Sequence, residues 1–309
     1  MKSKTGKMLA LILALSIVLS LGACGKKEDE PATTTLQDTA VNPGETAIQE
    51  GETTIPQETS ESETASAAEQ EDTTATTVAA PAGLPVGDAQ ILAAYTAVMN
   101  QAKKDRPGYK KIEHQILPEE DINIGGLVGR LLPIANRYMT TEEKARKNPM
   151  VAAKGSNLSK EELPVKWAEK GCMLTDVNAL KSANCTVLPN GNYKIVLMLK
   201  DEKNPEIWRS GDKAPSNIGA VFSPLAKSDV DKELQTSKLV KSVVKSAEYD
   251  LYYSGCTSTV VYNPKNNQVV SVYQYMYAFL DMKGDIALFG EAEGTAVLKM
   301  YYEAYDFTY

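Results

Sequence analysis

The chain of 309 residues has a single histidine, His114, and four cysteines, none of them in a Cys-x-x-Cys pair. A zinc site needs cysteine and histidine side chains clustered at ligand spacing, so the sequence predicts no metal site. A Ser-His-Asp or Cys-His mechanism would have to use His114. This residue lies in an alternating segment, residues 109–117, which is typical of a strand. We therefore interpret His114 as a histidine at a sheet face or edge, and we expect no catalytic residue and no cofactor.

Sequence motifs for phosphate binding, acid–base catalysis and calcium binding are also missing. The glycines at 125, 126 and 129 do not follow the G-x-G-x-x-G order, and no Gly-Lys-Ser/Thr sequence is present. Two carboxylate pairs could serve general acid–base chemistry, Asp229 with Asp231 and Asp281 with Asp285, but neither lies in a recognisable motif. The first pair also lacks the order of a calcium-binding loop. A hydrolase with a carboxylate-based site is therefore the least favoured of three functional hypotheses.

Residues 28–85 lack lysine, arginine and every aromatic residue, and they contain thirteen acidic residues and thirteen threonines. Such a segment cannot bury enough apolar surface to offset the entropy lost on ordering. Its charges and prolines favour an extended chain. We interpret residues 24–85 as a disordered spacer, with an acidic interaction tail as the alternative.

The negative net charge of the whole chain, −7, arises from the thirteen acidic residues of this spacer and not from the rest of the chain. Residues 86–309 hold 28 basic and 27 acidic residues, a net charge of +1. A domain this close to neutrality lacks the basic surplus typical of nucleic-acid binding, so no nucleic-acid partner is expected.

The N-terminus begins with Lys2, Lys4 and Lys7, continues with an apolar run over residues 8–21, and ends in Leu21-Gly22-Ala23-Cys24. A basic start, a short apolar run and small residues before a cleavage point are typical of a secretory signal. The Leu-Gly-Ala-Cys ending resembles the lipobox of bacterial lipoproteins. That resemblance implies a signal peptide over residues 1–23, a diacylglyceryl group on the Cys24 sulfur, and attachment to the outer side of the cell membrane. The spacer length favours a Gram-positive cell surface.

With Cys24 lipidated, three cysteines remain, Cys172, Cys185 and Cys256. An exported protein can form a disulfide, but three cysteines allow three different pairs and leave one thiol over. The sequence does not choose among them.

Helical periodicity dominates the first part of the domain. Apolar residues recur on one face over residues 88–105, with Asp88 as the expected N-cap, and a second apolar stripe follows over residues 127–138. A capping box over residues 159–162 predicts a short helix that leads towards Trp167.

From Val177 the period changes to two. Asn190-Gly191 predicts a hairpin, and a weak helix is expected over residues 226–235. Separate strands are then expected at 249–253, 257–262, 269–277, 286–289 and 295–305, with a connection near Lys283-Gly284. Short connections imply antiparallel neighbours. We therefore predict one α+β domain over residues 86–309, in which N-terminal helices pack on an antiparallel, meander-type sheet that could be strongly curved.

Eleven of the fifteen tyrosines lie between residues 249 and 309. Tyr273, Tyr275 and Tyr277 share one face of a predicted strand, and Tyr301 lies on the corresponding face of the last strand. Ordinary strand propensity explains such a pattern, but tyrosine is also well suited to contact a ligand. Our leading hypothesis is a non-catalytic binding domain that uses these four tyrosines to contact a protein, a glycan or an apolar ligand. The alternative is a carrier that holds a lipid or another apolar molecule inside a curved sheet.

Overall fold

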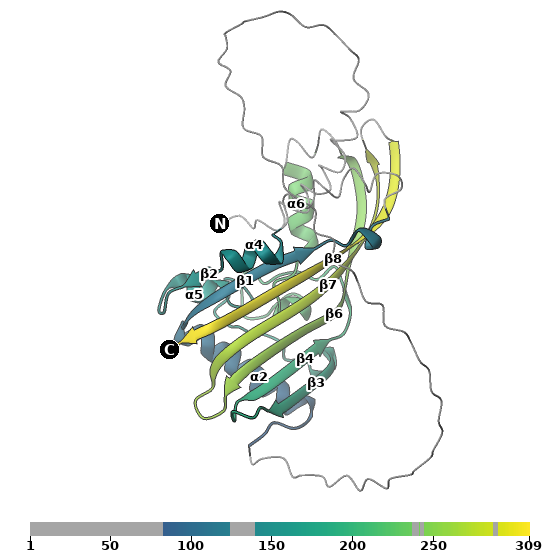
Figure 1. Cartoon of the computed structure of the whole chain (residues 1–309). Helices are drawn as coiled ribbons and strands as arrows, with labels where there is room; N and C mark the ends of the chain where they lie inside the picture. The colour runs from purple at the N-terminus through teal and green to yellow at the C-terminus, as the bar shows by residue number, and fades with distance from the viewer. Residues whose placement is uncertain (1–82, 124–139, 237–240, 242–243, 287–289) are drawn as a thin grey trace, which may run out of the picture. The chain divides into compact units, whose positions relative to one another are not determined.

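A computed structural model describes residues 83–123, 140–236, 241, 244–286 and 290–309. Its main feature is an eight-stranded antiparallel sheet in the order β2-β1-β8-β7-β6-β4-β3, with β5 paired to β6 (Figure 1). The strands are β1 Gly108–Ile116, β2 Met150–Ala152, β3 Leu180–Val187, β4 Tyr193–Leu199, β5 Glu202–Lys203, β6 Val244–Asn263, β7 Gln268–Ile286 and β8 Gly290–Thr308. The α-helices are α2 Gly87–Asp105, α4 Glu142–Lys147, α5 Asn157–Glu162 and α6 Lys227–Thr236. The predicted signal peptide, the spacer and the apolar stripe at 127–138 lie outside the described residues.

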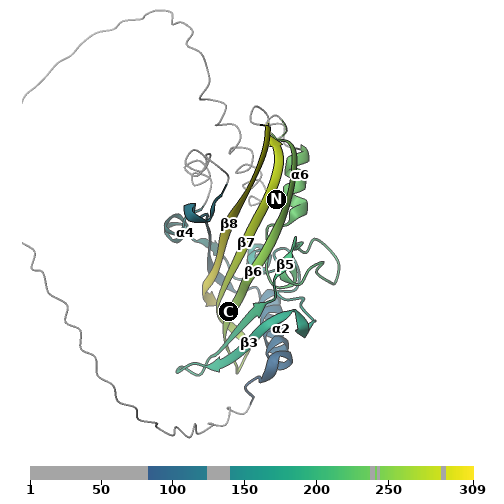
Figure 2. The same cartoon turned by 90° about the vertical axis from the view of Figure 1, so that its right-hand side faces the viewer.

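Helices α2 and α6 lie on one side of the sheet, and α4 lies on the other side (Figure 2). We call the side with α2 and α6 the inner face. The predicted helix over residues 88–105 is confirmed as α2, and its apolar stripe is buried. The Tyr95 hydroxyl lies 2.7 Å from the hydroxyl of Ser258 on β6, which ties α2 to the sheet. The predicted N-cap was wrong: Val86 occupies that position, and Asp88 lies in the first turn, where an acidic side chain complements the helix dipole.

Three long strands, β6 to β8, form a meander in the middle of the sheet. The prediction of two separate strands at 249–253 and 257–262 was wrong, because β6 runs through both. Gly255, with a φ of 59°, lies where the β6–β7 register shifts, so the strand accommodates the irregularity without ending. The expected connection at Lys283-Gly284 was also wrong. A Cβ at Gly284 would come within 2.5 Å of the Ser246 carbonyl oxygen, so this glycine permits a close approach of strands.

The hairpin at Asn190-Gly191 is confirmed, and it joins β3 to β4. Its turn is longer than a two-residue turn: Leu188 donates its backbone N–H to the Asn192 carbonyl, and Gly191 has a φ of 81°. This is the three-residue arrangement with glycine in the left-handed region. The short helix near residue 159 is confirmed as α5, but Ser156 caps it instead of Ser159, and it ends at Glu162 before reaching Trp167. The weak helix at 226–235 is confirmed as α6.

The predicted combination of helices with an antiparallel sheet is confirmed in outline. The sheet dominates and the helical share is modest. The core lies between the inner face and the helices, and it is filled by large side chains such as Tyr95, Phe222 and Tyr253, each at most 1 % exposed. Cys172, Cys185 and Cys256 are free thiols, and two of them are buried.

Candidate functional site: the outer face of the sheet

The two faces of the sheet differ sharply because strand residues alternate between them. On β7, Val272, Gln274, Met276 and Ala278 are buried against the core. The residues between them point to the opposite side, which we call the outer face. There, Tyr273 is 43 % exposed, and Tyr275 and Tyr277 are half-buried. The predicted tyrosines therefore lie on the solvent side of the sheet and not in the core.

The four predicted tyrosines belong to adjacent strands. Tyr301 on β8 pairs in register with Tyr275 on β7 and with His114 on β1. The Tyr301 ring stacks on His114 at 4.6 Å between centroids and meets Tyr275 at 5.1 Å. Tyr277 follows Tyr275 on the same face of β7 and pairs in register with Lys299 of β8. The ammonium group of Lys299 lies 5.8 Å from the centroid of the Tyr277 ring. The structure thus brings all four together, and it places His114 on a sheet face, as predicted.

Short hydroxyl side chains lie beside the tyrosines on the next strand. Ser254, Thr257 and Thr259 of β6 pair in register with Tyr277, Tyr275 and Tyr273, in that order. All three are half-buried. We call the strip formed by Tyr273, Tyr275, Tyr277, Ser254, Thr257 and Thr259 the tyrosine–hydroxyl strip. Because Ser and Thr are much smaller than Tyr, the tyrosine rings stand above a lower strip of hydroxyl groups.

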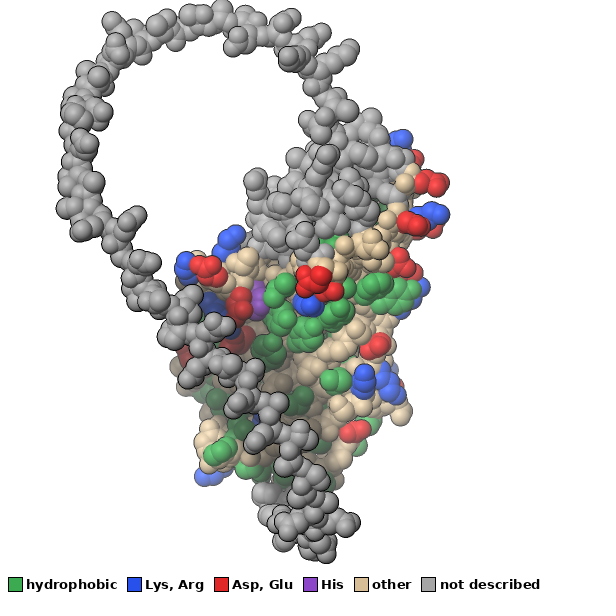
Figure 3. Space-filling view, turned by 45° about the vertical axis from the view of Figure 1, so that its right-hand side comes forward, with side chains coloured by type: hydrophobic (Ala, Val, Ile, Leu, Met, Phe, Trp, Pro, Cys, Tyr) green, Lys and Arg blue, Asp and Glu red, His purple; other side chains and the backbone are tan. Residues whose placement is uncertain are grey.

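Charged groups border the tyrosine–hydroxyl strip on its β8 side. Lys299 pairs with Asp121 at 3.2 Å, and Arg146 of α4 pairs with Glu303 at 3.2 Å. On the other side, β4 presents Lys194, Val196 and Met198 to the outer face. In the space-filling view, hydrophobic side chains gather beside tan surface, and acidic and basic side chains lie next to them and at the outline of the molecule (Figure 3). The strip itself carries no charged side chain.

Helix α4 completes the outer face and was not predicted. It begins because the Thr141 hydroxyl accepts a hydrogen bond from the Lys144 backbone N–H. Two glutamates follow in the first turn, and each pairs with a basic residue four positions later. These are recognisable helix signals, but the helix is only six residues long, too short for a clear periodicity.

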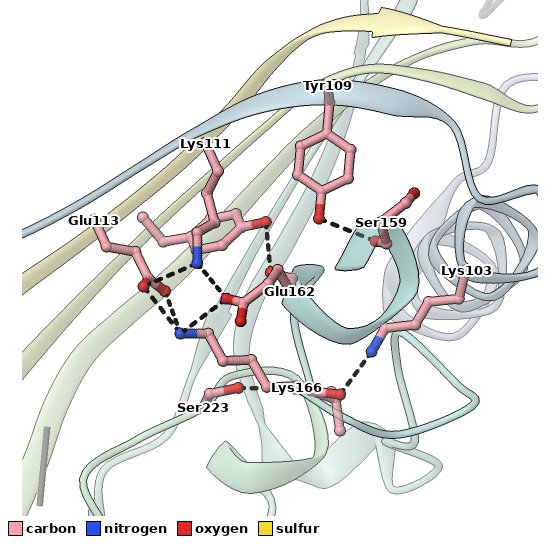
Figure 4. Close-up of polar contacts among 10 residues, drawn as sticks. Lys103, Tyr109, Lys111, Glu113, Ser159, Glu162, Lys166 and Ser223 are labelled. Atoms are coloured by element: carbon pink, nitrogen blue, oxygen red, sulfur yellow. Dashed lines mark hydrogen bonds and ion pairs between the residues drawn. The ribbon is translucent and has the colours of Figure 1, made fainter. Parts of the chain in front are cut away.

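A partly buried ion cluster lies on the inner side of β1 (Figure 4). Lys111 and Glu113 of β1 meet Glu162 of α5 and Lys166 of the following loop, with Lys166 Nζ 2.7 Å from Glu113 and 3.7 Å from Glu162. Burial alone would raise the pKa of Glu113, but the ammonium groups of Lys166 and Lys111 hold it at about 2. The cluster pairs two cations with two anions, so we interpret it as a structural clamp.

The clamp adjoins a strained loop. Val165 and Trp167 have φ values of 55° and 64°, unusual for side chains of this size. The buried Lys103 of α2 donates to the carbonyl oxygens of Val165 at 2.7 Å and Ala168 at 3.1 Å, and so holds the loop in place. The pKa of Lys103 is lowered to about 7, mainly because the side chain is buried and secondly because the positive charge of Lys160 lies near it.

In each of the two carboxylate pairs considered for a hydrolase, the two aspartates make different contacts. Asp229 pairs with Arg209 at 3.0 Å, whereas Asp231 pairs with Lys227 and accepts a hydrogen bond from the Tyr249 hydroxyl. Asp285 lies 3.8 Å from Lys245, and Asp281 is exposed. In the part of the chain that the structure describes, no group of three or more potential metal-ligating side chains is present.

No protein-family model, curated protein or solved structure matches this chain. The function therefore has to be inferred from its own residues. Among the described residues, none of the helices has the length and apolar character required to span a bilayer.

Proposed function

We propose that this chain is a lipid-anchored protein of the outer side of the cell membrane, and that its 86–309 domain binds a polysaccharide without catalysis. The observation that carries the proposal is the tyrosine–hydroxyl strip: tyrosine rings in a row, next to a row of hydroxyl groups, on the solvent side of β6 and β7, whose alternating residues Val272, Gln274 and Met276 are buried on the other side.

This chemistry matches a sugar chain. A pyranose ring presents an apolar C–H face and a rim of hydroxyl groups. Tyrosine offers an apolar ring and a polar tip, so it can contact both parts. At the base of the tyrosine–hydroxyl strip, the Thr257 hydroxyl donates to the Gly255 carbonyl oxygen at 3.0 Å and can accept from a sugar, whereas a free Ser or Thr hydroxyl can both donate and accept. Tyr273 to Tyr277 extend over ~13 Å of strand, which suits a chain of sugars better than a single one.

Other partners fit this surface less well. A peptide that adds a strand needs a free sheet edge, whereas the tyrosines lie on β7, between β6 and β8. A nucleic acid needs a basic surface, and the domain has a net charge of only +1. A carrier of an apolar molecule needs an apolar cavity. Next to α2 the inner face is filled by Tyr95, Phe222 and Tyr253. The cavity of about 500 Å³ between α6 and β6 is lined largely by polar and charged side chains, among them Asp231, Gln235 and Lys245. The packing therefore does not favour the carrier hypothesis.

Changing Cys24 to alanine is expected to release the protein from membranes and to leave the domain folded, because the spacer separates the anchor from the 86–309 domain. Cell fractionation with metabolic fatty-acid labelling would measure this. Labelling that persists in the Cys24→Ala protein would contradict the lipid anchor.

The binding proposal is tested by co-sedimentation with insoluble polysaccharides, including glycan strands from the cell wall. We expect the chain from residue 24 onward to sediment with at least one of them, and we expect Tyr273→Ala to weaken this binding about tenfold, as for an interface anchor. Trp167→Ala is the matched control, because Trp167 is also exposed (38 %) but lies in the loop after α5. Equal losses for both variants, or no sedimentation at all, would contradict the proposal.

A further inference from the structure

A small pocket opens at the edge of the tyrosine–hydroxyl strip, between α4 and the sheet. It has a volume of about 190 Å³, and its walls include His114, Tyr273 and Tyr301 from three different strands and Glu142, Arg146 and Glu303. Aromatic rings therefore form one part of the wall and charged groups the other.

The charges in this pocket do not balance. Arg146 lies between two carboxylates, 2.8 Å from Glu142 and 3.2 Å from Glu303. One guanidinium group is thus shared by two carboxylates, and the pocket keeps one net negative charge. The two carboxylates more than balance the charge of Arg146, so an anion from outside would meet a net negative charge here.

His114 is the second observation that points to a ligand. The residue is 8 % exposed and lines the pocket, and its ring makes no hydrogen bond to any other described residue. Among the described residues, no fully buried side-chain nitrogen or oxygen is left without a partner, so we take the free ring nitrogen of His114 to be accessible from the pocket. Burial also lowers the pKa of His114, which keeps the ring neutral at pH 7 with one nitrogen free to accept a hydrogen bond.

We infer that this pocket binds an ammonium group, carried by the polysaccharide as an amino sugar. The group would lie against the tyrosine rings, whose faces attract cations, and would donate to a carboxylate and to His114. An anion would meet Glu142 and Glu303, and an apolar group would leave the net negative charge of the pocket without a counterion and His114 without a partner. The inference rests on the proposed function, because the amino sugar is part of the proposed polysaccharide and because Tyr273 belongs both to this pocket and to the tyrosine–hydroxyl strip.

The test uses glucosamine and glucose, which differ only in an ammonium group in place of a hydroxyl group. Because His114 is the only histidine, its imidazole NMR signals can be assigned without ambiguity in the chain from residue 24 onward. We expect glucosamine to shift these signals and to bind about tenfold more tightly than glucose. Binding should weaken as the pH falls and His114 becomes protonated. The groups that face it are Glu142 and Arg146 of α4, Glu303 and Tyr301 of β8, and Tyr273 of β7.

Glu303→Gln is expected to abolish most of the preference for glucosamine, and Glu143→Gln is the control, because Glu143 lies on α4 but is exposed and pairs with Lys147 instead. Equal affinities for the two sugars, unchanged His114 signals, or equal effects of the two variants would overturn the inference. Tyr277→Ala separates the two proposals, because Tyr277 does not line the pocket. If Tyr277→Ala leaves polysaccharide binding unchanged while Glu303→Gln removes the glucosamine preference, the result supports ammonium binding in the pocket and contradicts polysaccharide binding at the tyrosine–hydroxyl strip.

Discussion

Lys166→Met is expected to lower the free energy of unfolding by about 3–5 kcal/mol, the usual cost of breaking a buried ion pair from one side. The variant leaves Glu113 and Glu162 to share Lys111 alone, so one negative charge remains without a counterion on the inner side of β1. Urea denaturation of the two proteins would measure the loss.

A surface pair provides the control for this prediction. Lys147 and Glu143 lie at a similar distance, 2.8 Å, but both side chains are at least 70 % exposed. Lys147→Met should therefore change the unfolding free energy by less than about 1 kcal/mol. Adding Glu113→Gln to Lys166→Met restores neutrality and should recover part of the loss. Equal effects of Lys166→Met and Lys147→Met would show that the buried cluster is not a clamp.

Tyr253→Ala is expected to cost about 3–5 kcal/mol of stability or more, as for other large core aromatics. Tyr253 is fully buried, and its hydroxyl both accepts from the Leu225 backbone N–H at 2.9 Å and donates to the Leu225 carbonyl at 3.1 Å. Its removal opens a cavity and leaves two buried backbone groups without partners.

The same substitution on the outer face gives the comparison. Tyr273→Ala removes a side chain that is 43 % exposed and should cost about 1 kcal/mol or less. Thermal or urea unfolding of both variants would measure whether the loss of stability differs between the inner and the outer face. A loss at Tyr273 as large as that at Tyr253 would show that the outer-face tyrosine is structural, and would remove the basis for the tyrosine–hydroxyl strip as a binding surface.

Periodicity in the sequence predicts the two faces of the sheet well, because alternation needs only local information. The alternation alone separates Tyr273 from Gln274 and assigns the tyrosines of β7 to one side of the sheet. Local information does not predict the structure at a glycine, because glycine occurs both in turns and within strands that approach each other closely. Gly284 resembles a turn residue in sequence, yet it allows two strands to approach closely, and this depends on Ser246, almost forty residues away.

The sites formed by distant segments could not be predicted. The ion cluster joins β1 to a loop more than fifty residues later, and neither segment has an unusual charge pattern. The pocket at His114 needs α4, whose position against β1 and β8 follows from tertiary packing. Only the tyrosines of β7 and β8 could be named from the sequence, because there the alternation and the composition coincide.

The most direct test of the proposed function is the affinity of two single variants for a polysaccharide that the wild-type chain binds. Tyr277→Ala removes a ring of the tyrosine–hydroxyl strip, and Thr259→Val removes only a hydroxyl group beside the row while keeping the branched shape of the side chain. We predict that each weakens binding about tenfold in isothermal titration, while the unfolding free energy changes by about 1 kcal/mol or less. Unchanged affinity in both variants, with the domain folded, would contradict polysaccharide binding at this face.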